Sequence, residues 1–161
     1  MNPADEQKIE EIYSLPCGRI IIFSHRFYEH KHKFNILIYK DINANDEKQI
    51  HCMTINSKIS EYHKKIHREK DYVLMQLKDY KFLDKDSHIN CINIRPIAIQ
   101  SIVSQYDTLF LRRDKDAKIS RQIRDDILQV MERSRHIDKG KMNKIISGLK
   151  SVYNDEVDVL F

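Results

Sequence analysis

The chain of 161 residues contains only three glycines, three prolines and three cysteines. So few glycines exclude a glycine-rich loop of the kind that cradles nucleotide phosphates. The cysteines are odd in number, widely spaced and without a Cys-x-x-Cys pair, which argues against a disulfide framework or a zinc site. We therefore expect no metal and no cofactor. Cys52 and Cys91 fall in apolar runs, so we expect them to be buried in a protein of the reducing cytosol.

The chain also lacks long apolar segments and a dominant charge of one sign. No apolar run approaches 18 residues, and the charged segment 2–11 has no apolar core of a secretion signal. Lys and Arg number 28 against 24 Asp and Glu, which gives a formal net charge of +4. This mild excess favours a polyanionic partner only modestly. We expect a soluble, cytoplasmic protein that makes no contact with a membrane.

Hydrophobic residues make up 41% of the chain and charged residues 32%, as in globular proteins. Apolar residues recur with helical or strand periodicity along most of the sequence. The segment 96–103 is a possible sixth strand or sheet edge. The expected helices cover 4–15, 118–135 and 141–152, and the expected strands cover 18–23, 34–39, 49–55, 72–77 and 88–94.

Short strands followed by helices predict an α+β fold, which we expect to be a small SH3-like antiparallel β-barrel. An open antiparallel sheet with helices on one face is the alternative, because strand order cannot be read from the sequence. We expect a single domain over residues 1–161. Its parts are an N-terminal helix (1–16), the barrel (17–105), two C-terminal helices (116–153) and a tail (154–161).

A loop between the first two expected strands is rich in histidine and in cationic residues. Metal-free RNA cleavage needs a base, an acid and a cation, and such residues can supply all three. Two aromatic residues among them can stack on bases. A solvated hairpin loop of accidental composition is an equally weighted alternative. The loop residues are His25, Arg26, Phe27, Tyr28, His30, Lys31, His32 and Lys33.

Two further polar segments are candidates for contact with a polyanion. Thr54 and Ser57 each offer a hydroxyl to a phosphate, although such residues more often cap their own backbone. The segment 63–70 is a second basic patch that can follow an RNA backbone or form a solvated face. Its His63 and His67 have a helical metal-ligand spacing, but the neighbouring lysines and the lack of a third ligand exclude a metal site.

Several short motifs follow one another in a recognisable order. Gly18-Arg19-Ile20 opens the first strand, His32-Lys33 precedes the apolar run 34–38, and Thr54 to Lys58 closes the third strand. With a late strand pair up to Pro96-Ile97 and a helix at 120–134, residues 18–137 resemble the MazF/PemK toxin family. In that family the basic residue before the second strand is usually Arg and is followed by Pro, whereas this chain has Lys33 and Phe34.

The resemblance implies a toxin of a toxin–antitoxin system that cleaves single-stranded RNA without a metal ion. It also implies a homodimer with an RNA groove at its interface and inhibition by a cognate antitoxin protein. The implied catalytic residues are Lys33, Thr54, Ser57 and His32. The expected nucleic-acid-binding residues are His25, Arg26, Tyr28, His30, Lys31, Lys58, Lys64 and Lys65.

Two other functions remain open. The first is a non-catalytic SH3-like module that binds nucleic acid or protein through the basic loop 25–33. The change from Arg to Lys33 favours this alternative, because a guanidinium grips two phosphate oxygens and an ammonium does not. The second is a structural or regulatory protein that docks a partner through its helical C-terminus and the acidic-apolar tail 155–161.

Overall fold

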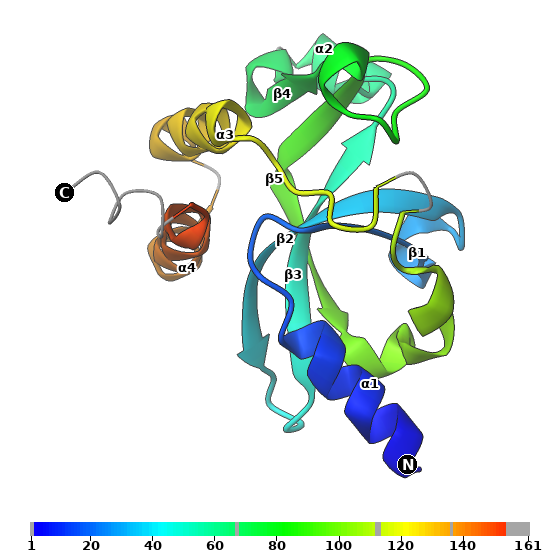
Figure 1. The fold of residues 1–161 in the computed structure, drawn as a ribbon. Coiled ribbons are helices and arrows are strands. Elements are labelled where there is room, and N and C mark those ends of the chain that lie inside the picture. Colours follow the sequence, from blue (N-terminus) through cyan, green and yellow to red (C-terminus); the bar gives the residue numbers. More distant parts are fainter. Residues whose placement is uncertain (1, 67, 112–113, 136, 154–161) are drawn as a thin grey trace, which may run out of the picture.

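The computed structural model describes residues 2–66, 68–111, 114–135 and 137–153 (Figure 1). At its centre is a five-stranded antiparallel sheet with the strand order β1-β2-β3-β5-β4. The strands are β1 (Ile20–Ser24), β2 (His32–Ile42), β3 (Lys48–Asn56), β4 (Tyr72–Met75) and β5 (Ser87–Ala98).

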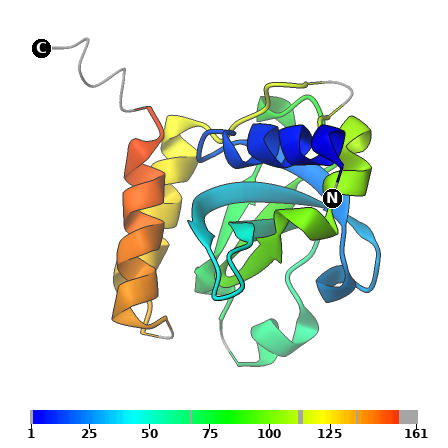
Figure 2. The ribbon, with the colours of Figure 1, turned by 90° about the horizontal axis from the view of Figure 1, so that it is seen from below.

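In the described ranges, four α-helices and five 3-10 helices surround the sheet. In Figures 1 and 2, α3 and α4 run side by side along one flank of the sheet, while α1 lies apart from them near the N-terminus. None of the helices in the described ranges combines the length and the hydrophobicity needed to cross a bilayer. The α-helices are α1 (Pro3–Tyr13), α2 (Glu61–Lys65), α3 (Arg121–Arg133) and α4 (Lys139–Ser151). The 3-10 helices are η1 (Arg26–Tyr28), η2 (Glu69–Asp71), η3 (Leu77–Asp79), η4 (Ile99–Ser101) and η5 (Val103–Thr108).

The α+β class predicted from the sequence is confirmed, but the closed barrel is not formed. Among the described residues β1 does not pair with β4, so the sheet stays open. The expected sixth strand is absent because Pro96 to Ala98 still belong to β5 and the chain then turns into η4 and η5. The outer edge of β1 is covered instead by Leu109 and Ala117, whose carbonyls accept the amides of Ile22 and Ile20, each at 2.8 Å. The tail 154–161 lies outside the described residues.

Side chains alternate between the two faces of the sheet, and each face carries its own hydrophobic core. Ile36, Ile38 and Met53 belong to the core on the side of α3 and α4. Leu37 and Cys52 belong to the opposite core, which α1, η4 and η5 help to cover. Each fully buried side chain of this size contributes roughly 1.5–3 kcal/mol to folding.

Helix α4 approaches β2 unusually closely at Gly148. A Cβ atom at this position would clash with the backbone carbonyl of Ile38. Glycine is therefore required here for close packing. Gly18 is required for a different reason, because its φ of 88° lies in the left-handed region. In addition, Val152 at the end of α4 leaves little room for a side chain there.

Candidate nucleic-acid interface

A wide bulge in β5 shapes the polar part of the sheet. Met53 pairs with Ile94 and Ile55 pairs with Ile89, so the single residue Thr54 of β3 faces residues 90–93 of β5. Extra residues in one strand bend it and redirect its side chains. As a result, two asparagines of β5 line a hollow next to Thr54.

The loop between β1 and β2 folds over this end of the sheet through its 3-10 helix η1. His25 is the N-cap of η1, and its Nδ1 accepts a hydrogen bond from the amide of Phe27 at 3.2 Å. The hydroxyl of Tyr28 donates to Oδ1 of the fully buried Asn35 at 2.7 Å, and Asn35 Nδ2 donates to the carbonyl of Lys33 at 2.8 Å. Burial raises the pKa of Tyr28 to about 12, so the phenol stays protonated and keeps this contact at neutral pH.

The loop then returns to β2 through a strained turn. The amide of Lys31 donates to the carbonyl of Tyr28 at 3.0 Å, which closes a four-residue turn. Its two central residues, Glu29 and His30, have φ angles of 54° and 60°. Positive φ at both positions is the signature of a type I′ turn, for which Asn-Gly is the preferred sequence. Residues other than glycine in sparsely populated backbone regions occur preferentially at functional sites.

A pocket of about 260 Å³ opens between this loop, the ends of β2 and β3, and the β5 bulge. It is smaller than the pockets that hold drug-sized ligands, so it suits a single group such as one base or one phosphate. Three cationic side chains line it against one carboxylate. The lining residues are Phe27, Tyr28, Glu29, Lys31, Lys33, Thr54, Asn56, Asn90, Asn93 and Arg95.

Contacts inside the pocket connect its separate segments. Lys33 Nζ donates to Asn56 Oδ1 at 3.2 Å, which joins β2 to the end of β3. The guanidinium of Arg95 lies 5.3 Å from the centre of the Phe27 ring, which joins β5 to η1. This separation is within the range of cation–π attraction. Lys31 Nζ lies 3.8 Å from the carboxylate of Glu29, whereas Lys33 and Arg95 are held without a carboxylate partner among the described residues.

The structure brings together four of the residues predicted from the sequence. Lys33 and Thr54 line the pocket from the adjacent strands β2 and β3, and Tyr28 and Lys31 line it from the loop. The arrangement follows from strand geometry, because Thr54 pairs with Asn35 and Asn35 lies two residues beyond Lys33 on the same face.

Other predicted residues lie outside the pocket. His32 neighbours Lys33 on β2 and so points to the opposite face, where it lines a separate hollow beside Phe34 and Phe82. His25 is 9% exposed and serves as the cap of η1. Burial, together with the charges of Arg26 and His30, lowers its pKa below the ordinary value.

The remaining predicted residues are exposed at the surface. Arg26 and His30 lie on the outside of the loop, and Ser57 and Lys58 follow the end of β3 without lining the pocket. Lys64 and Lys65 lie on α2, where Lys64 pairs with Glu61 at 3.4 Å. His67, considered for a metal site, lies outside the described residues.

Helix α2 lies one strand away from the pocket. His63 of α2 contacts the hydroxyl of Tyr72 on β4, and Tyr72 pairs with Asn90 of β5. Since directly paired residues share a face of the sheet, the basic helix and the pocket lie on the same side. The two basic regions predicted from the sequence therefore share one face of the sheet.

Sequence reasoning missed five residues of the pocket, which are Glu29, Asn56, Asn90, Asn93 and Arg95. The signal was present in the segment Asn-Cys-Ile-Asn-Ile-Arg, where polar residues interrupt an apolar strand. Asparagine is depleted in strands, so two of them within four strand residues need a reason. The wide bulge supplies that reason.

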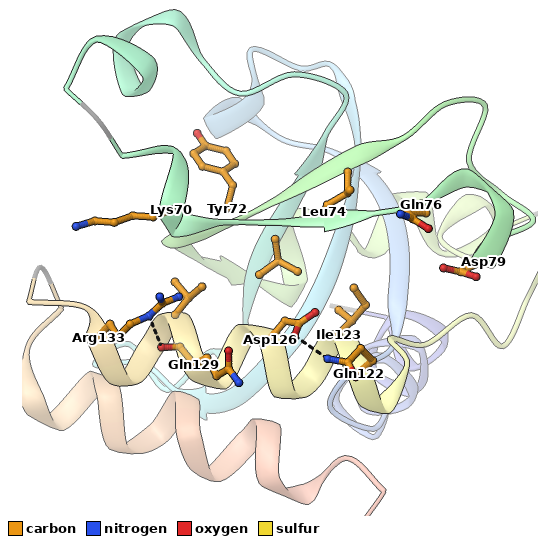
Figure 3. A pocket seen from close by; sticks show the side chains of 12 residues that line it. Lys70, Tyr72, Leu74, Gln76, Asp79, Gln122, Ile123, Asp126, Gln129 and Arg133 are labelled. Carbon is orange, nitrogen blue, oxygen red and sulfur yellow. Dashed lines mark hydrogen bonds between the residues drawn. The ribbon is translucent and has the colours of Figure 1, made fainter.

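A larger hollow of about 490 Å³ lies between β4 and α3 (Figure 3). Its cations, Lys70 and Arg133, are matched by the carboxylates of Asp79 and Asp126. Polar side chains on its helical wall bond within the helix, as Gln122 Nε2 does to Asp126 at 2.8 Å. The lining of this hollow carries two positive and two negative charges, so it has no net charge to attract a polyanion.

The described residues contain no group of three or more His, Cys, Asp or Glu side chains that could hold a metal ion. No protein-family model matches the chain, and a search of curated proteins finds no relative. Family membership therefore stays a prediction, and a function has to be inferred from the pocket beneath η1.

Proposed function

We propose that the protein binds single-stranded RNA in this pocket and cleaves it without a metal ion, as a toxin of a toxin–antitoxin system. The observation that carries the proposal is the convergence of Lys33, Thr54 and Arg95. They come from three different strands and line one small hollow. Cations and a hydroxyl around one hollow form a site for a phosphodiester.

Arg95 supplies the guanidinium group that this chain lacks before its second strand. The toxin family usually places an arginine before the second strand, whereas this chain has Lys33 there. Arg95 brings a guanidinium into the same pocket from β5. Its planar fork can hold two phosphoryl oxygens while Lys33 adds a point charge. Together they stabilise the charge that develops on the phosphoryl oxygens during cleavage.

Proton transfer falls to the carboxylate and the ammonium groups of the pocket. In the proposed step, Glu29 takes the proton of the ribose 2′-hydroxyl, and the resulting oxygen attacks the adjacent phosphorus. The bond from phosphorus to the 5′-oxygen breaks, and an ammonium group of Lys31 or Lys33 protonates that oxygen. The products are a 2′,3′-cyclic phosphate and a 5′-hydroxyl. His32 and Ser57 have no part in this scheme, because they lie outside the pocket.

The proposal includes the other properties that the resemblance implies. These are a sheet related to the SH3-like barrel, a homodimer with the RNA groove at its interface, inhibition by a cognate antitoxin and a cytoplasmic location. The position of α2 supports an extended RNA track, because its lysines lie on the same side of the sheet as the pocket. A longer track of cations increases affinity through counterion release.

A second function is RNA binding without cleavage. The observation that favours it is the composition of the pocket, whose lining contains no histidine in the part of the chain that the structure describes. Histidine is the most frequent acid or base in catalysis near neutral pH. In this alternative the same cations hold the phosphate and no bond is broken.

Incubation of the purified protein with a long single-stranded RNA in EDTA tests both functions. Lys33→Ala and Arg95→Ala are the test variants, and Lys150→Ala on the exposed end of α4 is the matched control. The proposal predicts fragments with cyclic phosphate ends from the parent and the control only. Intact RNA that is nevertheless bound, measured by fluorescence anisotropy, would support the binding function. Intact RNA without binding contradicts both.

A further inference from the structure

Asn90 is a buried polar residue without a partner. Its side chain is 6% exposed, and Oδ1 makes no hydrogen bond to any described residue. Leaving a buried acceptor unpaired destabilises the folded state. Buried polar groups in native proteins are nearly always satisfied, so an exception needs an explanation. Asn90 lines the pocket beneath η1, so a bound ligand can supply the missing hydrogen bond.

The unpaired atom restricts what can bind next to it. Oδ1 accepts hydrogen bonds and does not donate them, and the oxygens of a phosphodiester also only accept. A phosphate held by Lys33 and Arg95 therefore leaves Asn90 unsatisfied. The edges of nucleobases, by contrast, carry amino or imino hydrogens next to acceptor atoms. An amide matches such an edge with one donor and one acceptor.

The surroundings of Asn90 fit a base as well. Asn56 and Asn93 add two more amides to the same lining, and Phe27, which is 38% exposed, offers an aromatic ring at its margin. Exposed aromatic side chains stack on bases with little dependence on sequence. Amide groups then add the sequence-dependent part of the contact. His88, two residues before Asn90 on the same strand face, also has a buried Nδ1 without a partner.

We propose that Asn90 reads the base of the bound nucleotide, and that this base is adenine. Adenine places its N6 amino group beside a ring nitrogen, and asparagine pairs with these two atoms in a bidentate manner. The inference rests on the proposed RNA-binding function and adds the substrate preference of the same pocket. In this arrangement Lys33 and Arg95 hold the phosphate, while the β5 bulge presents Asn90 to the base.

Binding of short 2′-O-methyl RNAs tests the inference. The probes are five-nucleotide oligomers with uridine at the outer positions and adenine, cytosine, guanine, uracil or an abasic sugar at the centre. The 2′-O-methyl group blocks cleavage and removes the ribose hydroxyl as a donor to Asn90. Affinities are measured by fluorescence anisotropy at one fixed salt concentration, because phosphate contacts depend strongly on salt.

Three variants complete the design. Asn90→Ala removes the reader, and Asn90→Leu keeps its volume while removing its polar atoms. Asn143→Ala removes an exposed amide on α4, outside the pocket, and serves as the matched control. Because Asn90 has no partner to lose, both Asn90 variants should melt at or above the temperature of the parent. Thermal unfolding of all four proteins checks this expectation.

The parent should bind the adenine probe about tenfold or more tightly than the abasic probe, as one bidentate base contact allows. Both Asn90 variants should bind the two probes equally, while Asn143→Ala keeps the difference. Equal affinity of the parent for all five probes would overturn the inference and leave RNA binding standing. An adenine preference that survives in both Asn90 variants would also overturn it. Absence of binding to every probe would overturn the proposed function as well.

Discussion

Two stretches of β2 are covered in opposite ways. In the middle of the strand Leu37 and Ile38 belong to the two hydrophobic cores, and α4 packs so closely that a Cβ atom on Gly148 would clash with the strand backbone. At the start of the strand Lys33 and Asn35 lie under η1, which is held by hydrogen bonds and ring contacts. The first stretch is filled by apolar side chains, while the second encloses a polar pocket.

The difference between the two stretches separates stability from function along one strand. Close apolar packing contributes most of the free energy of folding and leaves no room for a ligand. The region under η1 contains a strained turn, an unpaired amide oxygen, and two cations without a carboxylate partner among the described residues, Lys33 and Arg95. All of these lower stability when no ligand is bound. Substitutions in the two stretches should therefore have different consequences.

Gly148→Ala should have the largest effect on folding. The added methyl group clashes with the backbone of β2, which cannot move without disturbing both cores. We expect a loss of about 3 kcal/mol in the free energy of unfolding, at the upper end of the range for overpacking. Gly140→Ala, near the start of the same helix and free of such a clash, is the matched control. Chemical denaturation in urea measures both, and similar stability of the two variants would contradict the close packing.

His30→Gly should have a smaller effect of opposite sign. Histidine at a φ of 60° is strained, and glycine removes that strain. We expect a gain of about 1 kcal/mol, because a left-handed conformation costs roughly 1–2 kcal/mol and glycine returns part of this in unfolded-chain entropy. Asp46→Gly, also at positive φ but in the β2–β3 turn, is the control. If strain serves the pocket, only His30→Gly should alter RNA affinity.

The pH dependence of stability should show the smallest effect. Burial lowers the folded-state pKa of His25 below its ordinary value near 6.5, so the unfolded chain binds a proton first as the pH falls. Its contribution to stability is therefore complete above about pH 6.5 and declines below it. His51, whose pKa burial also lowers, acts in the same direction. His25→Asn keeps a cap for η1, and urea unfolding between pH 5 and 8 should show a shallower decline. An unchanged slope would contradict this assignment.

The sequence predicted the fold where local pattern decides it and failed where pairing decides it. Apolar runs located all five strands and the two C-terminal helices, because periodicity is a property of neighbouring residues. The possible sixth strand at 96–103 was not found as a strand of its own. Pro96 sits where β5 has no second neighbour, and the chain beyond it can form 3-10 turns instead.

Only part of the candidate site was predicted from the sequence, for the same reason. Lys33 and Thr54 lie on strands that are adjacent in the sequence, so a family-like motif order was enough to join them. Arg95 and Asn90 reach the pocket through the bulge, which depends on how β5 pairs with β3. His32 lies on the opposite face of the sheet from Lys33, because β2 begins at His32 and consecutive strand residues alternate between faces.

The β5 bulge has a consequence for how this site can diverge. Residues 90–93 stand opposite one residue, while the pairs on either side of them keep the sheet in register. Within this segment Cys91 is fully buried in the core on the side of α3 and α4, whereas Asn90 and Asn93 line the pocket. Substitutions at the two asparagines can therefore change what the pocket recognises while the apolar side chains of the strand keep the core intact.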